Sequence, residues 1–500
     1  MIEIPFASEL KNGEMKPLKV GPLEDDLVLI AKHNGKLHSI GNYCTHFGAP
    51  LHTGTLYQDK VFCPWHSASF SIENGFIDGA PGLDGVPKYE VVEKGTQHFV
   101  NVPETIKKNE QPYLAKRNPQ NKSRYVVIGG GPAGLSCAET LRQAGFTGEI
   151  SLVSAESIAP YDRTGLSKAI GSGSAFSLRD QAYLREADID MHLNSRVTRV
   201  DSQNKTLTIQ QYASGTYATK PPIKGIDLQN VYLLRDHLDQ TNIKEKALNA
   251  QSIAIIGAGF IGSESAAALK MQYGDKKQIH LIHADQVPMQ RQFGLQVGQA
   301  LKNQHEQNGV SLNMNKMVVE ILSDDGKNAT GVLLNDGSII KSDLVIIGAG
   351  VLPSTQFLNN TGLNLDDKGA IFADSYLQTN HNDIFAAGDA VVFPYPHSNQ
   401  KVRIEHYITA MDQGAFAAFN MLGLNKAYNR VPFFWTRHYN QSIQYVGYAT
   451  AFDEVHVQGN VEKGEPFIAY YIQNDKVLAA SGLFKSDAIM TCLEALQRNY

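Results

Sequence analysis

The chain has 500 residues, which corresponds to three or four domains at about 150 residues per domain. A hydrophobic fraction of 42% and a charged fraction of 19% describe an ordinary globular protein. The net charge is −5 and no run of Lys and Arg occurs, which argues against nucleic acid as a partner. The longest apolar runs, such as residues 344–351, fall far short of the ~20 residues that cross a bilayer, so no transmembrane segment is expected.

The N-terminus and the cysteines bear on the compartment. Residues 1–5 have no basic n-region, no apolar h-region and no Arg-rich transit character, so no cleavable signal is expected. Of the 4 cysteines, Cys137 and Cys492 lie outside the Cys–His motifs described next, which is no disulfide framework. We therefore expect a cytoplasmic or mitochondrial protein rather than a secreted one.

The N-terminal part of the chain carries a metal-ligand pattern. Residues 1–103 alternate short β-type runs with Gly and Asn turns, as a small β-domain does. Within them, Cys44 and His46 form a C-x-H pair, and Cys63 and His66 form a C-x-x-H pair, with sixteen residues between the two pairs. A [2Fe–2S] cluster needs these ligands when two neutral imidazoles replace two thiolates on one iron. The pattern resembles a Rieske domain.

The alternative metal is zinc, which accepts the same ligand types. Zinc ligand pairs usually come as C-x-x-C or H-x-x-x-H, so the spacings here favour the iron–sulfur cluster. Neither loop has the extra cysteine that forms a disulfide in high-potential, respiratory Rieske domains. The loops therefore resemble the low-potential, ferredoxin-like type, which usually takes electrons from a flavin.

A glycine-rich motif follows in the middle of the chain. A strand predicted at residues 125–128 runs into Gly129, Gly131 and Gly134, a G-x-G-x-x-G set that precedes a predicted helix. The first glycine allows a tight turn, the second lets the backbone approach a pyrophosphate, and the third lets helix and strand pack closely. The pyrophosphate is then expected to lie against the helix N-terminus.

An acidic residue completes this motif. A strand predicted at residues 149–153 ends near Glu156, about 20 residues beyond the glycines. A carboxylate in that place binds the ribose diol of a dinucleotide. A glycine triplet alone is weak evidence, but strand, helix and acidic residue together predict a Rossmann-type dinucleotide site.

The same set recurs about 130 residues later. A strand predicted at residues 252–256 leads into Gly257, Gly259 and Gly262 and then into a second predicted helix. Two fingerprints predict two dinucleotides in one enzyme, one held tightly and one exchanging.

The second motif lacks its acidic residue. His283 stands where a carboxylate is expected, and Asp285 follows two residues later. A histidine cannot accept hydrogen bonds from both ribose hydroxyls as a carboxylate can. The choice between NADH and NADPH therefore stays open. A second dinucleotide site that no longer binds its ligand also remains an alternative.

Further motifs make the chain resemble the apoptosis-inducing-factor-like branch of the glutathione-reductase-type flavoproteins, relatives of the ferredoxin reductases of aromatic-ring dioxygenases. The resemblance covers nearly the whole chain, and some members of the branch carry an N-terminal Rieske domain. It implies FAD and NADH or NADPH as cofactors beside the [2Fe–2S] cluster. The motifs are Pro160-Tyr161-Asp162-Arg163, Leu166-Ser167-Lys168, Ser263-Glu264, Phe385-Ala386-Ala387-Gly388-Asp389, Glu405-His406-Tyr407 and Val431-Pro432-Phe433-Phe434-Trp435.

The resemblance implies roles for individual residues. Lys168 and Glu264 are implied to form a charge pair in the hydride-transfer site, with Lys168 close to the flavin ring. Taken alone, Lys168 is equally a solvated helix residue and Trp435 a core side chain. The residues implied around the dinucleotides are Glu156 at the FAD ribose, Asp389 at the ribitol, Arg163 and Arg235 near the FAD phosphates, Glu405 and His406 facing flavin and nicotinamide, and Trp435 shielding the flavin.

The chain departs from the family at His283 and between residues 207 and 225. There the family has a strand pair ending in an Ala-Thr-Gly-Ala-like turn, and about ten residues, including the apolar strand before that turn, are absent. Because this segment normally covers part of FAD, its loss is expected to weaken the flavin site or to open an edge for a partner. The C-x-x-x-x-C disulfide of many glutathione-reductase-type enzymes is also absent, which excludes disulfide reduction.

We expect a multidomain fold with a small all-β Rieske domain, two α/β Rossmann-type, glutathione-reductase-like domains and an α+β C-terminal domain. A polar, proline-containing stretch after the first domain is expected to be a linker. The expected boundaries are 1–103 for the Rieske domain, 104–123 for the linker, 124–248 and 376–430 for the two parts of the FAD domain, 249–375 for the NAD(P) domain and 431–500 for the C-terminal domain.

The expected activity is that of an NAD(P)H-dependent FAD oxidoreductase. Electrons from a hydride are expected to pass one at a time through FAD to the chain's own cluster, and on to an unknown acceptor that can be a protein. The alternative is a redox-degenerate structural or sensing subunit of a larger assembly, for example a mitochondrial respiratory one. A homodimer and a place in a larger complex both remain open.

Overall fold

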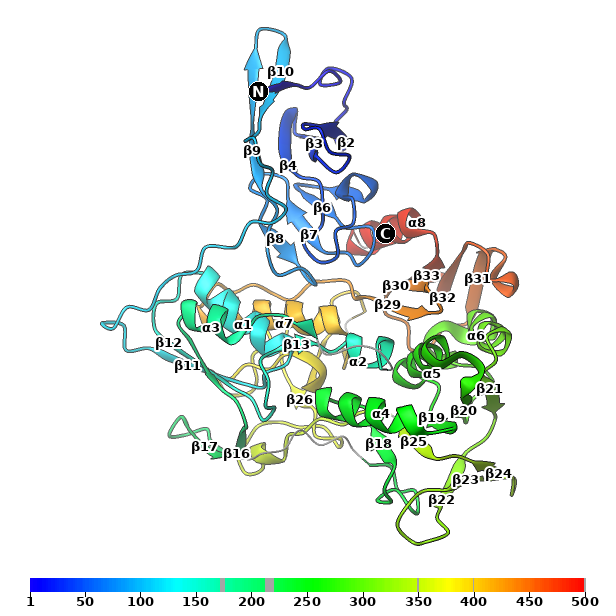
Figure 1. Cartoon of the computed structure of the whole chain (residues 1–500). Coiled ribbons are helices and arrows are strands. Elements are labelled where there is room, and N and C mark those ends of the chain that lie inside the picture. The colour runs from blue at the N-terminus through cyan, green and yellow to red at the C-terminus, as the bar shows by residue number, and fades with distance from the viewer. Residues whose placement is uncertain (171–175, 212–219, 349, 399, 499–500) are drawn as a thin grey trace.

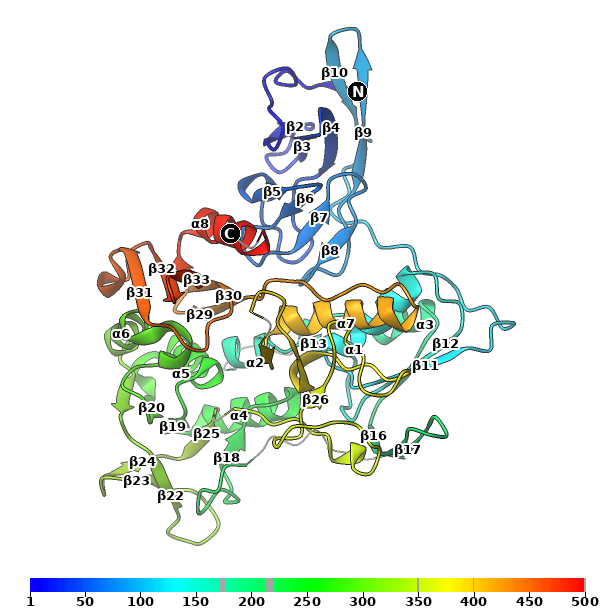
Figure 2. The ribbon, with the colours of Figure 1, turned by 180° about the vertical axis from the view of Figure 1, so that it is seen from behind.

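The computed structural model describes residues 1–170, 176–211, 220–348, 350–398 and 400–498. A β-domain formed by the N-terminal residues stands on a larger α/β body, and the C-terminal helix lies beside it in both views (Figures 1 and 2). Among the described residues, no helix combines the length and the apolar character needed to span a bilayer.

The N-terminal domain consists of two antiparallel sheets, with strand orders β1-β10-β9-β4-β3-β2 and β5-β6-β7-β8. Its apolar core includes the buried thiols of Cys44 and Cys63 beside Leu29 and Phe70. The strands are β1 (Ile2–Glu3), β2 (Met15–Lys19), β3 (Leu27–His33), β4 (Lys36–Gly41), β5 (Thr55–Tyr57), β6 (Lys60–Phe62), β7 (Ser69–Ser71), β8 (Ile77–Gly79), β9 (Lys88–Lys94) and β10 (Gln97–Asn101).

The first α/β unit is built on the parallel sheet β11-β12-β15. Helix α1 follows the first glycine motif and packs against α7, and Gly414 permits the contact because a Cβ there would lie 2.1 Å from the Ala133 carbonyl oxygen. The elements are β11 (Arg124–Ile128), α1 (Pro132–Gln143), β12 (Glu149–Val153), β13 (Tyr161–Asp162), α2 (Gly165–Lys168), β14 (Phe176–Ser177), α3 (Gln181–Glu186), β15 (Ile189–His192), β16 (Ser195–Asp201), β17 (Thr206–Gln211), β26 (Ile371–Phe372), β27 (Val391–Pro394), β28 (Lys401–Val402) and α7 (Tyr407–Met421).

Part of the shortened segment can be placed. Strand β17 pairs antiparallel with β16. Residues 212–219, on which the expectation of a missing cover over FAD rests, lie outside the described residues. Within the described part of the chain, β11 has one neighbouring strand, β12, and the Val126 and Ile128 side chains are exposed.

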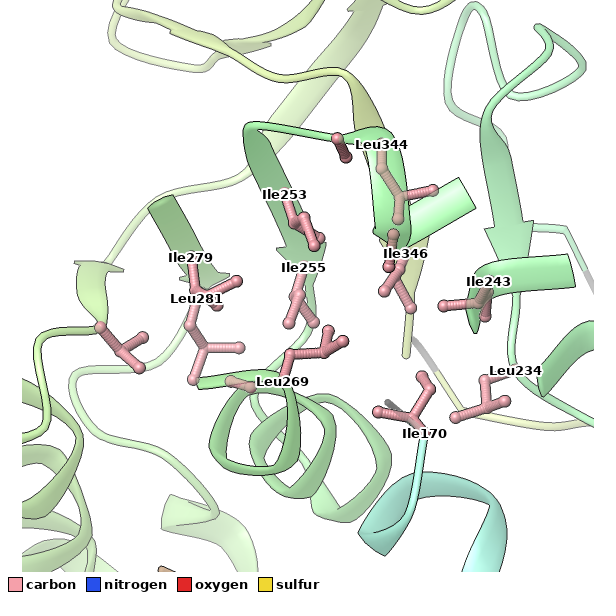
Figure 3. Packing of buried hydrophobic residues seen from close by; sticks show 14 of the residues in the cluster. Ile170, Leu234, Ile243, Ile253, Ile255, Leu269, Ile279, Leu281, Leu344 and Ile346 are labelled. Atoms are coloured by element: carbon pink, nitrogen blue, oxygen red, sulfur yellow. The ribbon is translucent and has the colours of Figure 1, made fainter. Parts of the chain in front are cut away.

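The second α/β unit has a five-stranded parallel sheet in the order β18-β25-β19-β20-β21. Its central strand β19 is buried throughout, as expected for a parallel sheet covered on both faces. Figure 3 shows Ile253 and Ile255 of β19 in one layer with Leu269 of α5. The elements are β18 (Val231–Leu233), α4 (His237–Asn249), β19 (Ser252–Ile256), α5 (Phe260–Tyr273), β20 (Gln278–His283), α6 (Gln290–Gln307), β21 (Ser311–Met314), β22 (Val318–Leu322), β23 (Gly331–Leu334), β24 (Ile339–Lys341) and β25 (Leu344–Ile347).

The C-terminal domain is an antiparallel sheet in the order β29-β30-β33-β32-β31. Helix α6 of the second unit contributes Phe293 to one side of this sheet, and α8 contributes Ile489 to a separate cluster with Val446. That cluster also holds Phe62 and Ala80 of the N-terminal domain, so the two domains share one apolar core. The elements are β29 (Phe433–His438), β30 (Gln441–Gly447), β31 (Glu454–Gly459), β32 (Phe467–Gln473), β33 (Lys476–Leu483) and α8 (Ser486–Gln497).

The predicted linker is bound along the first α/β unit. Its residues form neither helix nor strand apart from a bridge between Glu110 and Gly85. The Ala115 amide donates to the Arg142 carbonyl at 3.0 Å, and further hydrogen bonds follow up to residue 121. The linker therefore holds the N-terminal domain close to the body of the molecule.

Candidate redox site between the N-terminal and C-terminal domains

The two Cys–His loops of the N-terminal domain share one backbone pattern. The Cys44 amide donates to the Ala49 carbonyl at 2.9 Å, and the Cys63 amide donates to the Ala68 carbonyl at 2.8 Å. One loop follows β4 and the other connects β6 with β7. A hydrogen bond therefore closes each loop across six residues, and the cysteine and histidine of one loop lie near those of the other.

The four predicted metal ligands come together. The Nδ1 atoms of His46 and His66 lie 3.1 Å apart, close to the separation of about 3 Å expected for two imidazoles on one metal ion. The thiols of Cys44 and Cys63 are buried, and their interaction with each other raises the pKa of Cys44 and lowers that of Cys63. The backbone amides of the next loop residues act to lower the pKa of both thiols, and amides beside the sulfurs tune the potential of an iron–sulfur centre.

The protonation state of the histidines suits metal binding. Burial lowers the pKa of His46 to about 4 and that of His66 to about 3, so both imidazoles are neutral at neutral pH. Metal ligands must be neutral imidazoles and thiolates. A binuclear cluster needs two ligands per iron, and the thiol pair and the imidazole pair match this requirement. The donor set therefore fits a Rieske cluster.

Trp435 connects this ligand pair with the α/β body. It lies on β29 of the C-terminal domain, and its ring centroid is 4.1 Å from that of His66 and 6.2 Å from that of His46. The Lys168 ammonium lies 5.7 Å from the centroid of the same ring. Residues that are far apart in the sequence thus form one continuous row.

Lys168 and Glu264 form the predicted charge pair. The Lys168 Nζ atom is 3.0 Å from Glu264 Oε1, and the Glu264 side chain is 2% exposed. Two hydroxyl groups also donate to this carboxylate, Ser167 at 2.5 Å and Thr436 at 2.8 Å. The carboxylate is therefore fully engaged, and it holds the ammonium in one place. Sequence reasoning gave Ser167 and Thr436 no role.

The first glycine loop has the geometry of a dinucleotide site. Gly129 has φ +112°, and a Cβ on Gly134 would lie 1.9 Å from the Gly129 carbonyl oxygen, so only glycine fits. Arg163 lies beside the loop, with Nε 3.9 Å from the place of a Cβ on Gly131. Glu156 is buried and accepts hydrogen bonds from the Arg163 guanidinium and, at 2.7 Å, from Tyr161.

Charged groups surround the predicted ribitol residue. Asp389 is half-buried, and desolvation raises the pKa of its carboxyl group, while Arg235, Arg163 and Arg403 act in the opposite direction. Arg403 also donates to the Asp389 backbone carbonyl at 3.0 Å and pairs with Glu405 at 2.5 Å. This concentration of arginines suits a pyrophosphate.

His406 leaves a polar atom without a protein partner. It precedes helix α7, its ring lies 4.3 Å from that of Phe434, and burial lowers its pKa to about 4. Among the described residues its buried Nδ1 atom has no hydrogen-bond partner. A buried orphan atom of this kind fits a bound group, so the predicted FAD residues are compatible with the flavin.

The second glycine loop repeats the first. Gly257 has φ +98°, and a Cβ on Gly262 would lie 1.8 Å from the Gly257 carbonyl oxygen, whereas Gly259 has no atom within 4 Å of such a Cβ. At the end of β20, His283 Nε2 is 3.2 Å from Asp285 Oδ2, and burial lowers the pKa of His283. A carboxylate is thus present beside the predicted ribose position, but it belongs to Asp285.

Contacts between domains were missed by sequence reasoning. Gln444 of β30 donates to the Pro64 and Trp65 carbonyls at 2.7 and 2.8 Å, which ties the second cluster loop to the C-terminal sheet. Arg430 pairs with Asp78 at 2.6 Å. No local pattern in the sequence marks these residues as interface residues.

A third contact joins the N-terminal domain to the first α/β unit. Arg179 pairs with Asp84 at 2.6 Å and with Glu139 of α1 at 2.7 Å. Asp412 of α7 accepts a hydrogen bond from the Ala80 amide at 3.1 Å. The N-terminal domain is therefore docked on both neighbours.

The chain is similar to named proteins over most of its length. Apoptosis-inducing factor 3 of Mus musculus is 33% identical over 98% of this chain and 82% of its own length. Rhodocoxin reductase of Rhodococcus erythropolis is 32% identical over 68% of this chain and 81% of its own length.

Solved structures agree with this likeness. The covalent putidaredoxin reductase–putidaredoxin complex matches 76% of this chain and 94% of the matched chain, with 25% identity and a TM-score of 0.70. A ferredoxin reductase from Rhodopseudomonas palustris matches 72% of this chain and 91% of its own, with 26% identity and a TM-score of 0.67.

Three family descriptions match successive parts of the chain. They are Rieske [2Fe–2S] domain at residues 1–90, pyridine nucleotide-disulphide oxidoreductase at 123–414, and reductase C-terminal at 433–500. The chain therefore belongs to the pyridine nucleotide-disulphide oxidoreductase family and is an NAD(P)H-dependent flavoprotein oxidoreductase of the ferredoxin-reductase type, with FAD and a Rieske [2Fe–2S] cluster as its cofactors.

Proposed function

We propose that this protein transfers electrons from NAD(P)H by way of FAD to its own Rieske cluster, and from there to a separate one-electron acceptor. The observation that carries the proposal is the position of Trp435, whose ring lies 4.1 Å from that of His66 and 5.7 Å from the Lys168 ammonium. When bound, FAD takes two electrons with a hydride and releases them singly, and the cluster takes one electron at a time.

Lys168 and Glu264 are proposed to position the hydride-transfer site. The carboxylate binds the ammonium at 3.0 Å in a buried environment. A fixed positive charge stabilises negative charge that develops nearby, and it does so without reorganisation at the moment of reaction. Glu264 in this role keeps the Lys168 proton and orients its Nζ atom.

The remaining residues are proposed to hold the two dinucleotides and the cluster. Glycine loops admit the backbone close to each pyrophosphate, arginines neutralise the phosphates, and thiolates and imidazoles bind the irons. The proposed residues are Gly129, Gly131, Gly134, Glu156, Arg163, Arg235, Asp389, Glu405, His406 and Trp435 for FAD, Gly257, Gly259, Gly262 and His283 for NAD(P)H, and Cys44, His46, Cys63 and His66 for the cluster.

Docking of the Rieske domain supports transfer within the chain. The contacts of Gln444, Arg430 and Asp412 keep His66 against Trp435. A tethered domain meets its partner site at an effective concentration of about mM, so transfer needs no diffusing ferredoxin. The match to ferredoxin reductases gives no support to the alternative of a redox-degenerate subunit.

An anaerobic titration with NADH and then NADPH, followed by absorbance and EPR, tests the proposal. We expect the flavin to bleach and a rhombic Rieske-type signal to appear, and the more effective nicotinamide identifies the reductant. In Trp435→Leu, flavin reduction should persist while cluster reduction slows by about tenfold, because the positioned contact is lost. Trp65→Leu, which changes the chain's other tryptophan, is the control. A flavin that bleaches while the cluster stays oxidised would overturn the proposal.

A further inference from the structure

His305 is a buried histidine that the proposed electron route does not use. It lies near the end of α6, and its Nε2 atom is 2.8 Å from the Ser263 hydroxyl while its Nδ1 atom is 2.8 Å from the Tyr439 hydroxyl. Burial lowers its pKa well below the ordinary value, so the ring is neutral. A neutral imidazole has one donor and one acceptor nitrogen, and it can therefore bind both hydroxyls at once. The ring of His438 packs against it, with the two centroids 5.4 Å apart.

The two hydroxyls belong to elements that carry residues of the redox site. Ser263 is buried on α5, the helix of the second glycine motif, and directly precedes Glu264. Tyr439 directly follows β29, the strand that supplies the Thr436 hydroxyl to the Glu264 carboxylate. His305 therefore connects the helix of the predicted NAD(P) site with the end of the strand that packs against it.

Helix α5 is attached to its neighbours at two successive residues. Ser263 binds His305. Glu264 binds the Thr436 hydroxyl at 2.8 Å and the Lys168 ammonium at 3.0 Å. Successive side chains of an α-helix point about 100° apart, so the two attachments act on different sides of α5 and together fix its rotation about its own axis. A rotation of about 10° would move a carboxylate about 6 Å from the axis by about 1 Å.

We propose that His305 is a positioning residue for hydride transfer: by binding Ser263 and Tyr439 together, it fixes the rotation of α5 and with it the Glu264 carboxylate. This inference rests on the proposed function, because it concerns how the charge pair of Glu264 and Lys168 is held in place. The imidazole transfers no proton in this role, and it makes or breaks no covalent bond. Its effect on rate comes from geometry, since a displacement of about 1 Å can cost about a hundredfold.

Ser263→Ala and Tyr439→Phe test the proposal, because each removes one hydroxyl that binds His305. Stopped-flow reduction of the holoenzyme flavin is measured with NADH and with NADPH at increasing concentrations. We expect each variant to lower the limiting rate about tenfold, and to leave the concentration for half the limiting rate within about twofold. The double variant should be no slower than the slower single variant, since both hydroxyls act through one ring.

Tyr471→Phe is the matched control. The Tyr471 hydroxyl is also buried, lies 2.8 Å from the Ser481 hydroxyl and donates to the Phe293 carbonyl at 3.2 Å, so its removal also breaks buried hydrogen bonds. This variant should keep the limiting rate of the unchanged protein. Hydrogen–deuterium exchange of the holoenzyme gives a readout without turnover: the α5 amides should exchange faster in Ser263→Ala and Tyr439→Phe, but not in Tyr471→Phe.

Three outcomes would overturn the proposal: an unchanged limiting rate in both hydroxyl variants, an equal loss in Tyr471→Phe, or losses that multiply in the double variant. If one hydroxyl variant fails to retain FAD, the other carries the test. If neither nicotinamide reduces the flavin of the unchanged protein, the proposed function fails. The exchange of the α5 amides then still decides whether His305 holds this helix.

Discussion

Glu264 is a buried charged residue whose carboxylate is held from several sides. Its carboxylate accepts hydrogen bonds from the Ser167 and Thr436 hydroxyls and pairs with the Lys168 ammonium, and it is 2% exposed. A buried carboxylate with every acceptor engaged is rigid, and its removal leaves a partly buried cation without its partner.

Glu264→Ala should therefore destabilise the protein by about 3 kcal/mol, the lower end of the cost of breaking a buried ion pair. Urea unfolding of the holoenzyme measures this loss as a lower midpoint. Glu454→Ala removes an exposed carboxylate and should cost less than about 0.5 kcal/mol. Equal losses in both variants would contradict the role of Glu264 as the anchor of Lys168.

His283 is expected to influence the choice between NADH and NADPH. It stands at the end of β20, beside Asp285 at 3.2 Å. A carboxylate accepts hydrogen bonds from both ribose hydroxyls and repels a 2′-phosphate, whereas an imidazole does neither. His283→Glu should therefore raise the ratio of kcat/KM for NADH to that for NADPH about tenfold. His283→Gln, which keeps a neutral side chain, should change the ratio less, and a ratio that is the same in both variants would refute this explanation.

At the scale of elements, two glycines of the second glycine loop are expected to respond differently to substitution by alanine. At one the added methyl group would clash with the protein itself, and at the other it would clash only with the bound dinucleotide. A Cβ on Gly262 would lie 1.8 Å from the Gly257 carbonyl oxygen, but a Cβ on Gly259 would meet no protein atom within 4 Å. Gly262→Ala should lower the melting temperature as well as nicotinamide binding, because helix α5 must shift. Gly259→Ala should leave the melting temperature unchanged and raise the KM for NAD(P)H, since the added methyl meets the dinucleotide alone. Thermal unfolding and steady-state kinetics distinguish the two, and a lowered melting temperature in Gly259→Ala would contradict the argument.

Local sequence patterns predicted these elements well. Strands β12 and β19 begin and end where the apolar runs at residues 149–153 and 252–256 place them. The glycine motifs predict the two loops directly, because a tight turn and a close helix contact each need a residue without a Cβ. The four proposed metal ligands came from their spacing, and the structure places His46 beside His66 and Cys44 beside Cys63.

Contacts between distant segments could not be predicted in the same way. Gln444 binds the Pro64 carbonyl across 380 residues of sequence, and Arg430 meets Asp78 across 352. No periodicity or motif links such residues, since each partner is unremarkable in its own segment. The position of Trp435 against His66 follows from this docking, so the family resemblance implied a tryptophan near the flavin but not its contact with the proposed cluster ligand.

At the scale of the whole molecule, the docking of the Rieske domain includes a buried titratable group. Asp412 lies on α7 and accepts a hydrogen bond from the Ala80 amide at 3.1 Å. Burial raises the pKa of its carboxyl group from 3.8 to about 6, and Arg430 partly opposes this shift. The stability of the docked protein is therefore coupled to pH through this residue.

The sign of the coupling follows from the two pKa values. The folded protein keeps the Asp412 proton up to pH of about 6, while the unfolded chain releases it near 3.8. Between these values the folded state binds more protons, so the free energy of unfolding decreases as pH rises from 4 to 6 and this contribution is then constant. Asp412→Asn keeps an oxygen acceptor for the Ala80 amide but does not titrate. The free energy of unfolding of Asp412→Asn minus that of the unchanged protein should therefore be about 2 kcal/mol larger at pH 7 than at pH 4. Urea unfolding across this range measures the difference, with the exposed Asp324→Asn as a control, and a difference that does not depend on pH would show that Asp412 ionises alike in the folded and unfolded states.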